Sequence, residues 1–144
     1  MGKVEEAITL FDFWRKKFRI KPIPFKQDNR ESGHFVSHFE DNKAVRVTYN
    51  SKNLKEWNYP MILSGIFHEI GHLRIPDHPY ETERDKVEEE YLAESYSIKM
   101  VKKYYPFMLK GIVEYQKHKM NSSKFRRSAP IHFKAFSQIK EYMI

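Results

Sequence analysis

The segment His68-Glu69-Ile70-Gly71-His72 constrains this chain more than any other, because it places two imidazoles and a carboxylate inside a strongly apolar stretch. Pro60 stands where a proline commonly opens a helix, and Ser64 is the only other polar side chain between positions 60 and 73. Unpaired histidines and a carboxylate would be costly in a buried helix. On a helix, residues four apart share one face, so both imidazoles can reach a single metal ion. The sequence therefore predicts a buried, metal-binding helix over about 60–73.

Zinc is the metal that this H-E-x-x-H pattern predicts, since zinc accepts nitrogen and oxygen ligands and lowers the pKa of its water to about 7. His68 and His72 are the predicted ligands. Glu69 lies between them and can take a proton from the attacking water and hand it to a leaving amine. The chain contains no cysteine, which excludes zinc fingers, thiol catalysis and disulfides. We therefore expect a zinc-dependent hydrolase whose catalytic residue is Glu69.

A catalytic zinc site needs a third protein ligand, and the sequence offers two candidates. Glu90 and Glu94 lie four residues apart on a predicted helix, in phase with its apolar stripe, so both should point inward. Glu90 could then bind zinc while Glu94 holds the free ring N–H of a histidine. His78 is the alternative metal ligand, six residues after His72. The turn that it would require favours glycine, where this chain has Ile75.

The remaining pattern predicts an α+β fold in a single domain over residues 1–144. Apolar residues recur at steps of three and four over 3–19, which predicts an N-terminal amphipathic helix. Two strand-like runs, 33–40 and 43–50, flank Asp41-Asn42, a dipeptide suited to a tight turn, so they predict a β-hairpin forming a small antiparallel sheet. Further helices are expected over about 82–105, 107–119 and 131–142, with breaks at Pro76, Pro106 and 121–123.

The hairpin also sets expectations for two more histidines. Pairing Glu40 with Lys43 gives the cross-strand pairs His38–Val45, Val36–Val47 and His34–Tyr49, all on one face of the ribbon. His34 and His38 would then be surface or half-buried residues rather than ligands. Glu88 and Glu89 are predicted to lie on a solvated face, and His118 and His132 are expected to take no part in catalysis.

The net charge of +7 is concentrated at the two ends of the chain, in residues 1–30 and 107–144. These basic ends could contact nucleic acid or an acidic partner, or simply face solvent. Whether residues 107–144 fold back over the site as an inhibitory segment is left open by the sequence. No apolar run is long enough to span a membrane, and the N-terminus lacks a signal peptide's apolar stretch. We therefore expect a soluble, cytoplasmic protein that does not contact a membrane.

The two motifs together resemble a known family. H-E-I-G-H-L followed by E-x-x-A-E-x-Y-S, which starts at Glu90, is similar to gluzincin-type metallopeptidases of minimal size. These are the minigluzincins, the Ste24/HtpX catalytic core and the ImmA/IrrE-type proteins. The resemblance covers about residues 3–106 and implies a zincin-like domain. It implies His68, His72 and Glu90 as zinc ligands and Glu69 as general base.

The same resemblance implies that an edge strand beside the zinc, supplied by the hairpin, binds the substrate chain by strand addition. This chain departs from the family pattern at Glu94, where Asp or Asn is more usual. The resemblance does not extend to the basic helical segment 107–144.

Three functions are compatible with these features. The first is a zinc peptidase that hydrolyses peptide bonds of an extended protein segment. The second is a regulatory, DNA-associated zincin, similar to ImmA/IrrE or SprT proteins, that acts on a repressor or another DNA-bound protein. The third is a non-catalytic zinc-binding module, which Glu69 disfavours because a structural site needs no base. The sequence does not indicate the substrate, the cleavage site, the oxyanion-stabilising residue or the oligomeric state.

Overall fold

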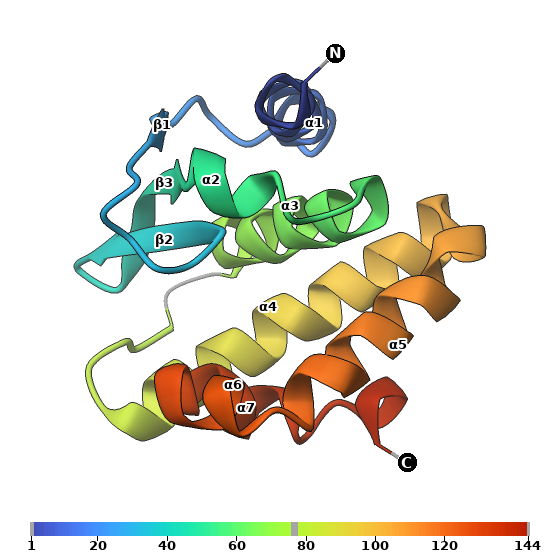
Figure 1. Ribbon diagram of the computed structural model, residues 1–144. Helices are drawn as coiled ribbons and strands as arrows, with labels where there is room; N and C mark the ends of the chain where they lie inside the picture. The colour runs from blue at the N-terminus through green and yellow to red at the C-terminus, as the bar shows by residue number, and fades with distance from the viewer. Residues whose placement is uncertain (1, 76–77, 144) are drawn as a thin grey trace.

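The computed structural model describes residues 2–75 and 78–143, and it combines helices with one small sheet (Figure 1). The elements are α1 (Lys3–Lys17), β1 (Phe25–Gln27), β2 (Phe35–Glu40), β3 (Lys43–Tyr49), α2 (Ser51–Leu54), α3 (Tyr59–Arg74), α4 (Glu83–Tyr104), α5 (Leu109–Met120), α6 (Ser123–Ser128) and α7 (Pro130–Phe136), with 3-10 turns at Pro106–Met108 and Lys140–Tyr142. The predicted α+β class is confirmed. Among the described helices, none is long and apolar enough to cross a membrane.

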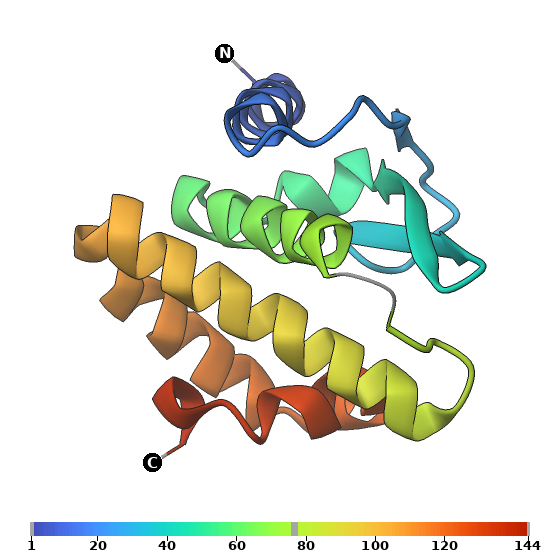
Figure 2. The same cartoon turned by 180° about the vertical axis from the view of Figure 1, so that it is seen from behind.

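Helix α3 lies at the centre of the molecule (Figures 1 and 2). Helix α1 and the sheet lie on one side of it, and α4 runs along its other side. Helices α5, α6 and α7 lie beyond α4 in both views, so α4 has neighbours on two sides. The core is built largely from the apolar face that each helix turns towards α3. Its largest buried side chains include Phe11, Trp14, Leu54, Ile62, Ile66, Phe67 and Ile70.

The predicted hairpin is confirmed, but its predicted register is wrong beyond the turn. Asp41 and Asn42 both adopt positive φ, and Glu40 pairs with Lys43 as expected. A bulge then follows between His38 and Phe39, so that Val45 becomes an extra residue on β3. The observed pairs are Phe39–Ala44, His38–Arg46, Ser37–Val47, Val36–Thr48 and Phe35–Tyr49. A shift of one residue exchanges the two faces of a strand, so Ser37 shares the face of Val47.

The sheet is mixed rather than antiparallel. Strand β3 is central, with β2 antiparallel on one side and β1 parallel on the other. The sequence did not predict β1, because the prolines at positions 22 and 24 indicate an irregular connection and the strand is only three residues long. This arrangement leaves β2 at the edge of the sheet.

Helix α3 follows the sequence prediction closely. The side chain of Asn58 accepts a hydrogen bond from the Met61 N–H, and Pro60 lies in the first turn. The helix ends at Arg74, and the predicted break at Pro76 lies outside the described residues. Gly71 brings α3 close to α4, since a Cβ at this position would lie 3.1 Å from both Cα and O of Ala93.

Helix α4 begins with a capping box at Thr82 and Asp85, whose side chains each accept a backbone N–H of the other residue. It ends before Pro106, as predicted. The expected helix over 107–119 corresponds to α5, whereas the one expected over 131–142 is divided between α7 and a 3-10 turn. Helix α6 was not predicted. It is held by Phe125, which packs in a second apolar cluster beneath α4.

Candidate metal centre

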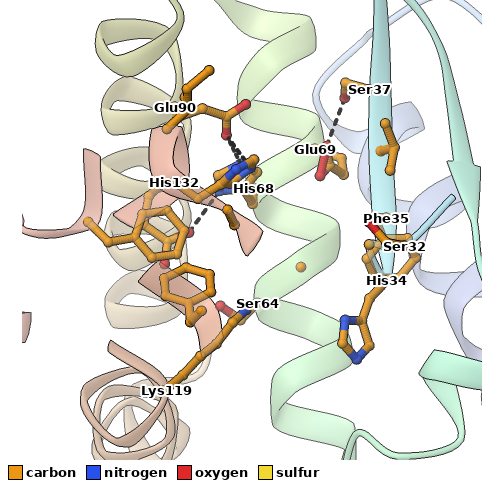
Figure 3. Close-up of a pocket in the computed structure, with 18 of the residues that line it drawn as sticks. Ser32, His34, Phe35, Ser37, Ser64, His68, Glu69, Glu90, Lys119 and His132 are labelled. Carbon is orange, nitrogen blue, oxygen red and sulfur yellow. Dashed lines mark hydrogen bonds and ion pairs between the residues drawn. The ribbon is translucent and has the colours of Figure 1, made fainter. Parts of the chain in front are cut away.

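Two histidines of α3, His68 and His72, and Glu90 of α4 meet in the interior. Figure 3 shows His68 and Glu90 of this group. His68 Nε2 lies 2.8 Å from Glu90 Oε2, and His72 Nε2 lies 3.1 Å from Glu90 Oε1. All three side chains are buried. The four-residue spacing on α3 places both rings on one face, and the phase of α4 directs Glu90 between them. The structure therefore brings together the three residues that the sequence predicted as ligands.

The second ring nitrogen of each histidine faces a carboxylate of its own. His68 Nδ1 lies 2.8 Å from Glu94 Oε1, and His72 Nδ1 lies 2.7 Å from Glu89 Oε2. A carboxylate at Nδ1 favours the tautomer that carries its proton there, so the Nε2 lone pair is directed away from it. Both Nε2 lone pairs are thereby turned towards Glu90. The predicted position of Glu94 beside a histidine agrees with this geometry.

Glu89 is 2% exposed, so the prediction that it lies on a solvated face is wrong. Glu88 does lie on that face, with a side chain that is 59% exposed. The physical reason is that Glu89 lies on the face of α4 that meets α3 and His78, since its carboxylate contacts His72 Nδ1 and lies 3.7 Å from His78 Nδ1. Glu89 thus becomes an additional functional candidate that the charge run in the sequence concealed.

The buried charges shift one another's pKa. Burial opposes protonation of His72, but the negative charge of Glu90 and the hydrogen bond to Glu89 raise its pKa to about 9. Against the same burial effect, Glu90 and Glu94 raise the pKa of His68 well above its usual value. Burial would raise the pKa of Glu90, yet the neighbouring imidazoles hold it well below its usual range. The cluster therefore requires positive charge at its centre, which a bound cation can supply in place of ring protons.

The donor atoms fit a metal ion. Two imine lone pairs and a carboxylate facing one another repel unless a proton or a cation lies between them. Imidazole nitrogen and carboxylate oxygen together suit zinc and similar divalent ions. His68, Glu69 and His72 offer ligand atoms within 4.8 Å of one another, and so do His68, Glu90 and His132. The protein thus presents buried histidine and glutamate groups positioned to hold a metal ion.

Glu69 lies beside this cluster and is held from the sheet. Its Oε1 accepts a hydrogen bond from Ser37 Oγ of β2 at 2.8 Å (Figure 3). The carboxylate is 5% exposed and lines a cavity. The sequence did not predict the role of Ser37. In the predicted register Val36 pairs with Val47, so Ser37 would lie on the other face of the sheet, away from Val47. The bulge at Val45 is what turns it towards α3.

His78, the alternative ligand, faces the outer glutamates. Its Nε2 lies 3.3 Å from Glu88 Oε2, and its Nδ1 lies 3.7 Å from Glu89 Oε1. Within residues 2–75 and 78–143, it belongs to neither group of potential metal ligands. The structure therefore places His78 beyond Glu89, on the far side of that carboxylate from His72.

His132 of α7 lies beside Glu90 in the site. The sequence did not predict this approach. The Nε2 atom of His132 lies 3.1 Å from Glu90 Oε2, and its ring stacks near that of His68 with centroids 6.2 Å apart. Its side chain remains 46% exposed. The segment whose position the sequence left open therefore folds over the cluster. No local pattern marks His132, since it stands in a short helix of a basic region.

The C-terminal segment also anchors Glu94. Tyr142 OH donates a hydrogen bond to Glu94 Oε2, and Gln116 Nε2 donates another at 3.4 Å. Burial and the charge of Glu94 raise the pKa of Tyr142 well above its usual value, so the hydroxyl stays protonated as a donor. Glu94 is in this way held between His68 and two residues that lie far along the chain.

A cavity of about 420 Å³ opens beside the cluster. Its walls come from β2 and the segment before it, from α3, and from the C-terminal helices (Figure 3). His68, Glu69 and Glu90 lie at one end of it. A molecule that enters this cavity would therefore meet the histidine and glutamate cluster directly.

No protein-family model, curated protein or solved structure matches this chain.

Proposed function

We propose that this protein is a zinc-dependent peptidase of the gluzincin type. In this proposal His68, His72 and Glu90 bind zinc, and Glu69 is the general base. The observation that carries the proposal is a division among the buried carboxylates. Glu89, Glu90 and Glu94 each contact an imidazole, whereas Glu69 is held by a serine of the sheet and faces the cavity. A purely structural metal site has no need of such a fourth carboxylate.

The residues divide the chemistry as follows. Zinc held at this site would polarise the scissile carbonyl and acidify water. Glu69 accepts a proton from the attacking water and returns it to the leaving nitrogen, so that the peptide C–N bond breaks into a carboxylic acid and an amine. Ser37 Oγ donates a hydrogen bond to Oε1 of Glu69, so Oε2 is the oxygen that remains to accept the proton of the water. Glu94 and Glu89 keep both imidazoles in the tautomer that presents Nε2.

The position of β2 supports an extended peptide as the substrate. Within the described residues β2 pairs only with β3, so its other edge offers backbone donors and acceptors. Phe35, Val36 and Ser37 of this strand line the cavity. A substrate chain that adds to this edge would run past Glu69, as strand addition requires.

The approach of His132 favours a second candidate, a non-catalytic metal site. His132 could complete a set of four protein ligands with His68, His72 and Glu90, which would close the coordination sphere. Under this candidate His132→Asn weakens metal binding as strongly as His72→Ala does. Under the peptidase proposal the ion keeps three ligands in His132→Asn, and its affinity changes by less than about tenfold.

The experiment that tests the peptidase proposal compares Glu69→Gln with the parent on a pool of internally quenched random peptides. Gln keeps the size and the hydrogen bond to Ser37 but cannot accept the proton. We expect the zinc content and melting temperature of the parent, with turnover lower by about 10²–10⁴-fold. Glu88→Gln, which changes an exposed charge, should retain full activity. Unchanged hydrolysis in Glu69→Gln, or loss of its zinc, would contradict the proposal.

A further inference from the structure

The cavity has a second end, which lies away from the histidine and glutamate cluster and is lined by other residues. It follows α3 from His68 and Glu69 back past Ser64 and Gly65. Gly65 lies one helical turn before Glu69, about 6 Å along the helix axis. A Cβ at Gly65 would lie 2.8 Å from the ring of Phe35, so glycine is what leaves room here. This second end is defined by His34, Trp57, Gln116 and Lys119, which all line the cavity.

Lys119 brings a positive charge to this end. Its side chain extends from α5 towards Ser64 of α3, while the ring of His34 points into the same space from the opposite wall (Figure 3). Lys119 Nζ lies 4.6 Å from the ring centroid of Phe125, and it forms no ion pair with any residue that the structure describes. Burial lowers the pKa of Lys119, and the charge of Glu94 partly offsets this effect. An ammonium group is therefore desolvated without a direct counter-ion.

Two further polar atoms at this end lack partners. His34 Nε2 and Gln116 Oε1 are buried, and neither makes a hydrogen bond in the described part of the chain. The His34 ring is fixed by stacking on Trp57, with centroids 3.7 Å apart and planes 5° apart. Gln116 is 6% exposed, and its amide nitrogen is directed to Glu94. Buried polar groups are rarely left unpaired, so these atoms point to a ligand that completes them.

We propose that this end of the cavity binds the side-chain carboxylate of a glutamate or aspartate in the substrate. Lys119 Nζ and His34 Nε2–H would donate to the carboxylate, and Gln116 Oε1, an acceptor, would receive a substrate N–H. Glu69, Glu90 and Glu94 make the other end of the cavity negative, which directs an acidic side chain towards Lys119. Gly65 adjoins Trp57, on which His34 stacks, and lies about 6 Å along α3 from Glu69, so we expect the acidic residue near the cleaved bond in an extended chain with about 3.3 Å per residue. This assignment rests on the proposed peptidase function and narrows its substrate class.

The first test measures selectivity with peptides that differ only by Glu or Gln at each position. The zinc-loaded parent should prefer the Glu member of at least one pair by about tenfold or more in kcat/KM. Lys119→Met should lose this preference, so that its ratio of kcat/KM on the Glu peptide to kcat/KM on the Gln peptide falls to about one. Lys110→Met removes an exposed lysine of the same helix and should keep the preference. Equal rates on both peptides in the parent, or an unchanged preference in Lys119→Met, would overturn the assignment.

The second test needs no turnover. N-acetylglutamate N-methylamide should shift the imidazole NMR signals of His34, identified by their loss in His34→Gln, and raise the low pKa of that ring. N-acetylglutamine N-methylamide should leave the His34 signals and pKa unchanged, and Lys119→Met should abolish the response to the glutamate compound. Absence of a shift with the parent would overturn the site.

These arms separate the two proposals. A His34 response without cleavage of any peptide keeps the carboxylate site and removes the peptidase. Cleavage of peptides without a preference for Glu over Gln keeps the peptidase and removes the carboxylate site. A preference for peptides with a free C-terminal carboxylate over amidated ones, without the Glu preference, would assign the site to a chain end and overturn its assignment to a side chain.

Discussion

Glu89 Oε2 lies 2.7 Å from His72 Nδ1, and Glu89 directly precedes the predicted ligand Glu90 in the sequence. Two successive residues of α4 thus contact the two nitrogens of one imidazole, since His72 Nε2 lies 3.1 Å from Glu90 Oε1. His68 is held in the same way between Glu90 and Glu94. Both rings are therefore fixed from two directions before any cation binds, which reduces the reorganisation that binding requires.

The contact of Glu89 with His72 leads to a first prediction. Glu89→Gln keeps a hydrogen-bond acceptor but removes the charge that makes the ring a stronger ligand. We expect zinc affinity to fall by about 10–100-fold, the usual effect of losing such a partner. Competition with a chromophoric chelator measures this, with Glu88→Gln as the exposed control. An affinity equal to that of the parent would show that Glu89 does not support the ligand.

A second prediction ranks the candidates for the third ligand. Glu90→Ala should lower zinc affinity by several orders of magnitude, because its carboxylate lies between both Nε2 atoms. His78→Ala should leave the affinity within a few-fold, since its ring faces Glu88 and Glu89. Metal titration of both purified variants checks the ranking. The opposite order would make His78 the ligand.

The hydroxyl of Tyr142 leads to a third prediction. Tyr142→Phe removes a donor to the buried carboxylate of Glu94. A hydrogen bond to a charged group contributes about 1.5–3 kcal/mol, so the free energy of unfolding should fall by about that amount. Urea denaturation of the metal-free protein measures it, with Tyr91→Phe as a control on α4. A loss no larger than that of the control would show that Glu94 does not depend on this donor.

A fourth prediction concerns acid stability. Burial, together with the charge of Lys119, lowers the pKa of His34 to about 4 from 6.5. Between these values the unfolded chain binds the proton and the folded chain does not, so the contribution is present above about pH 6.5 and is lost as the pH falls towards 4. The free energy of unfolding of the parent should therefore fall more, between about pH 7 and about pH 4.5, than that of His34→Gln.

The comparison for this fourth prediction uses metal-free proteins, so that both contain the same histidine and glutamate cluster. His118→Gln, which removes an exposed histidine of α5, should keep the pH dependence of the parent. Identical slopes for the parent and His34→Gln would indicate that His34 titrates normally in the folded protein.

The sequence predicted the elements with local signals. Pro60 and the apolar run located α3, Thr82 and Pro106 bounded α4, and Asp41-Asn42 located the hairpin turn. The inward direction of Glu90 and Glu94 followed from helical phase, because they share a stripe with Val87, Ile98 and Val101, which pack in the two apolar clusters. Features of this kind depend on neighbours in sequence, and the chain displays them directly.

What the sequence did not predict depends on long-range packing. The bulge at Val45 exchanges the faces of a strand and so brings Ser37 to Glu69, although no turn or proline marks it. Glu89 is buried because its face of α4 packs against His72 of α3 and against His78. His132 and Tyr142 reach the site only after the C-terminal helices fold back. Their contributions could be inferred only from the packed structure.

The hydrogen bond from Tyr142 to Glu94 joins residues 48 positions apart, and it sets an order of events during synthesis. Chains leave the ribosome from the N-terminus, so α3 and α4 emerge before the segment that carries Tyr142. His68, His72 and Glu90 can therefore meet while Glu94 still lacks this donor and α7 has not yet covered the cluster. A nascent chain at that stage would present an open, incompletely supported histidine and glutamate cluster, and docking of the C-terminal segment would then cover it and supply the missing donor to Glu94.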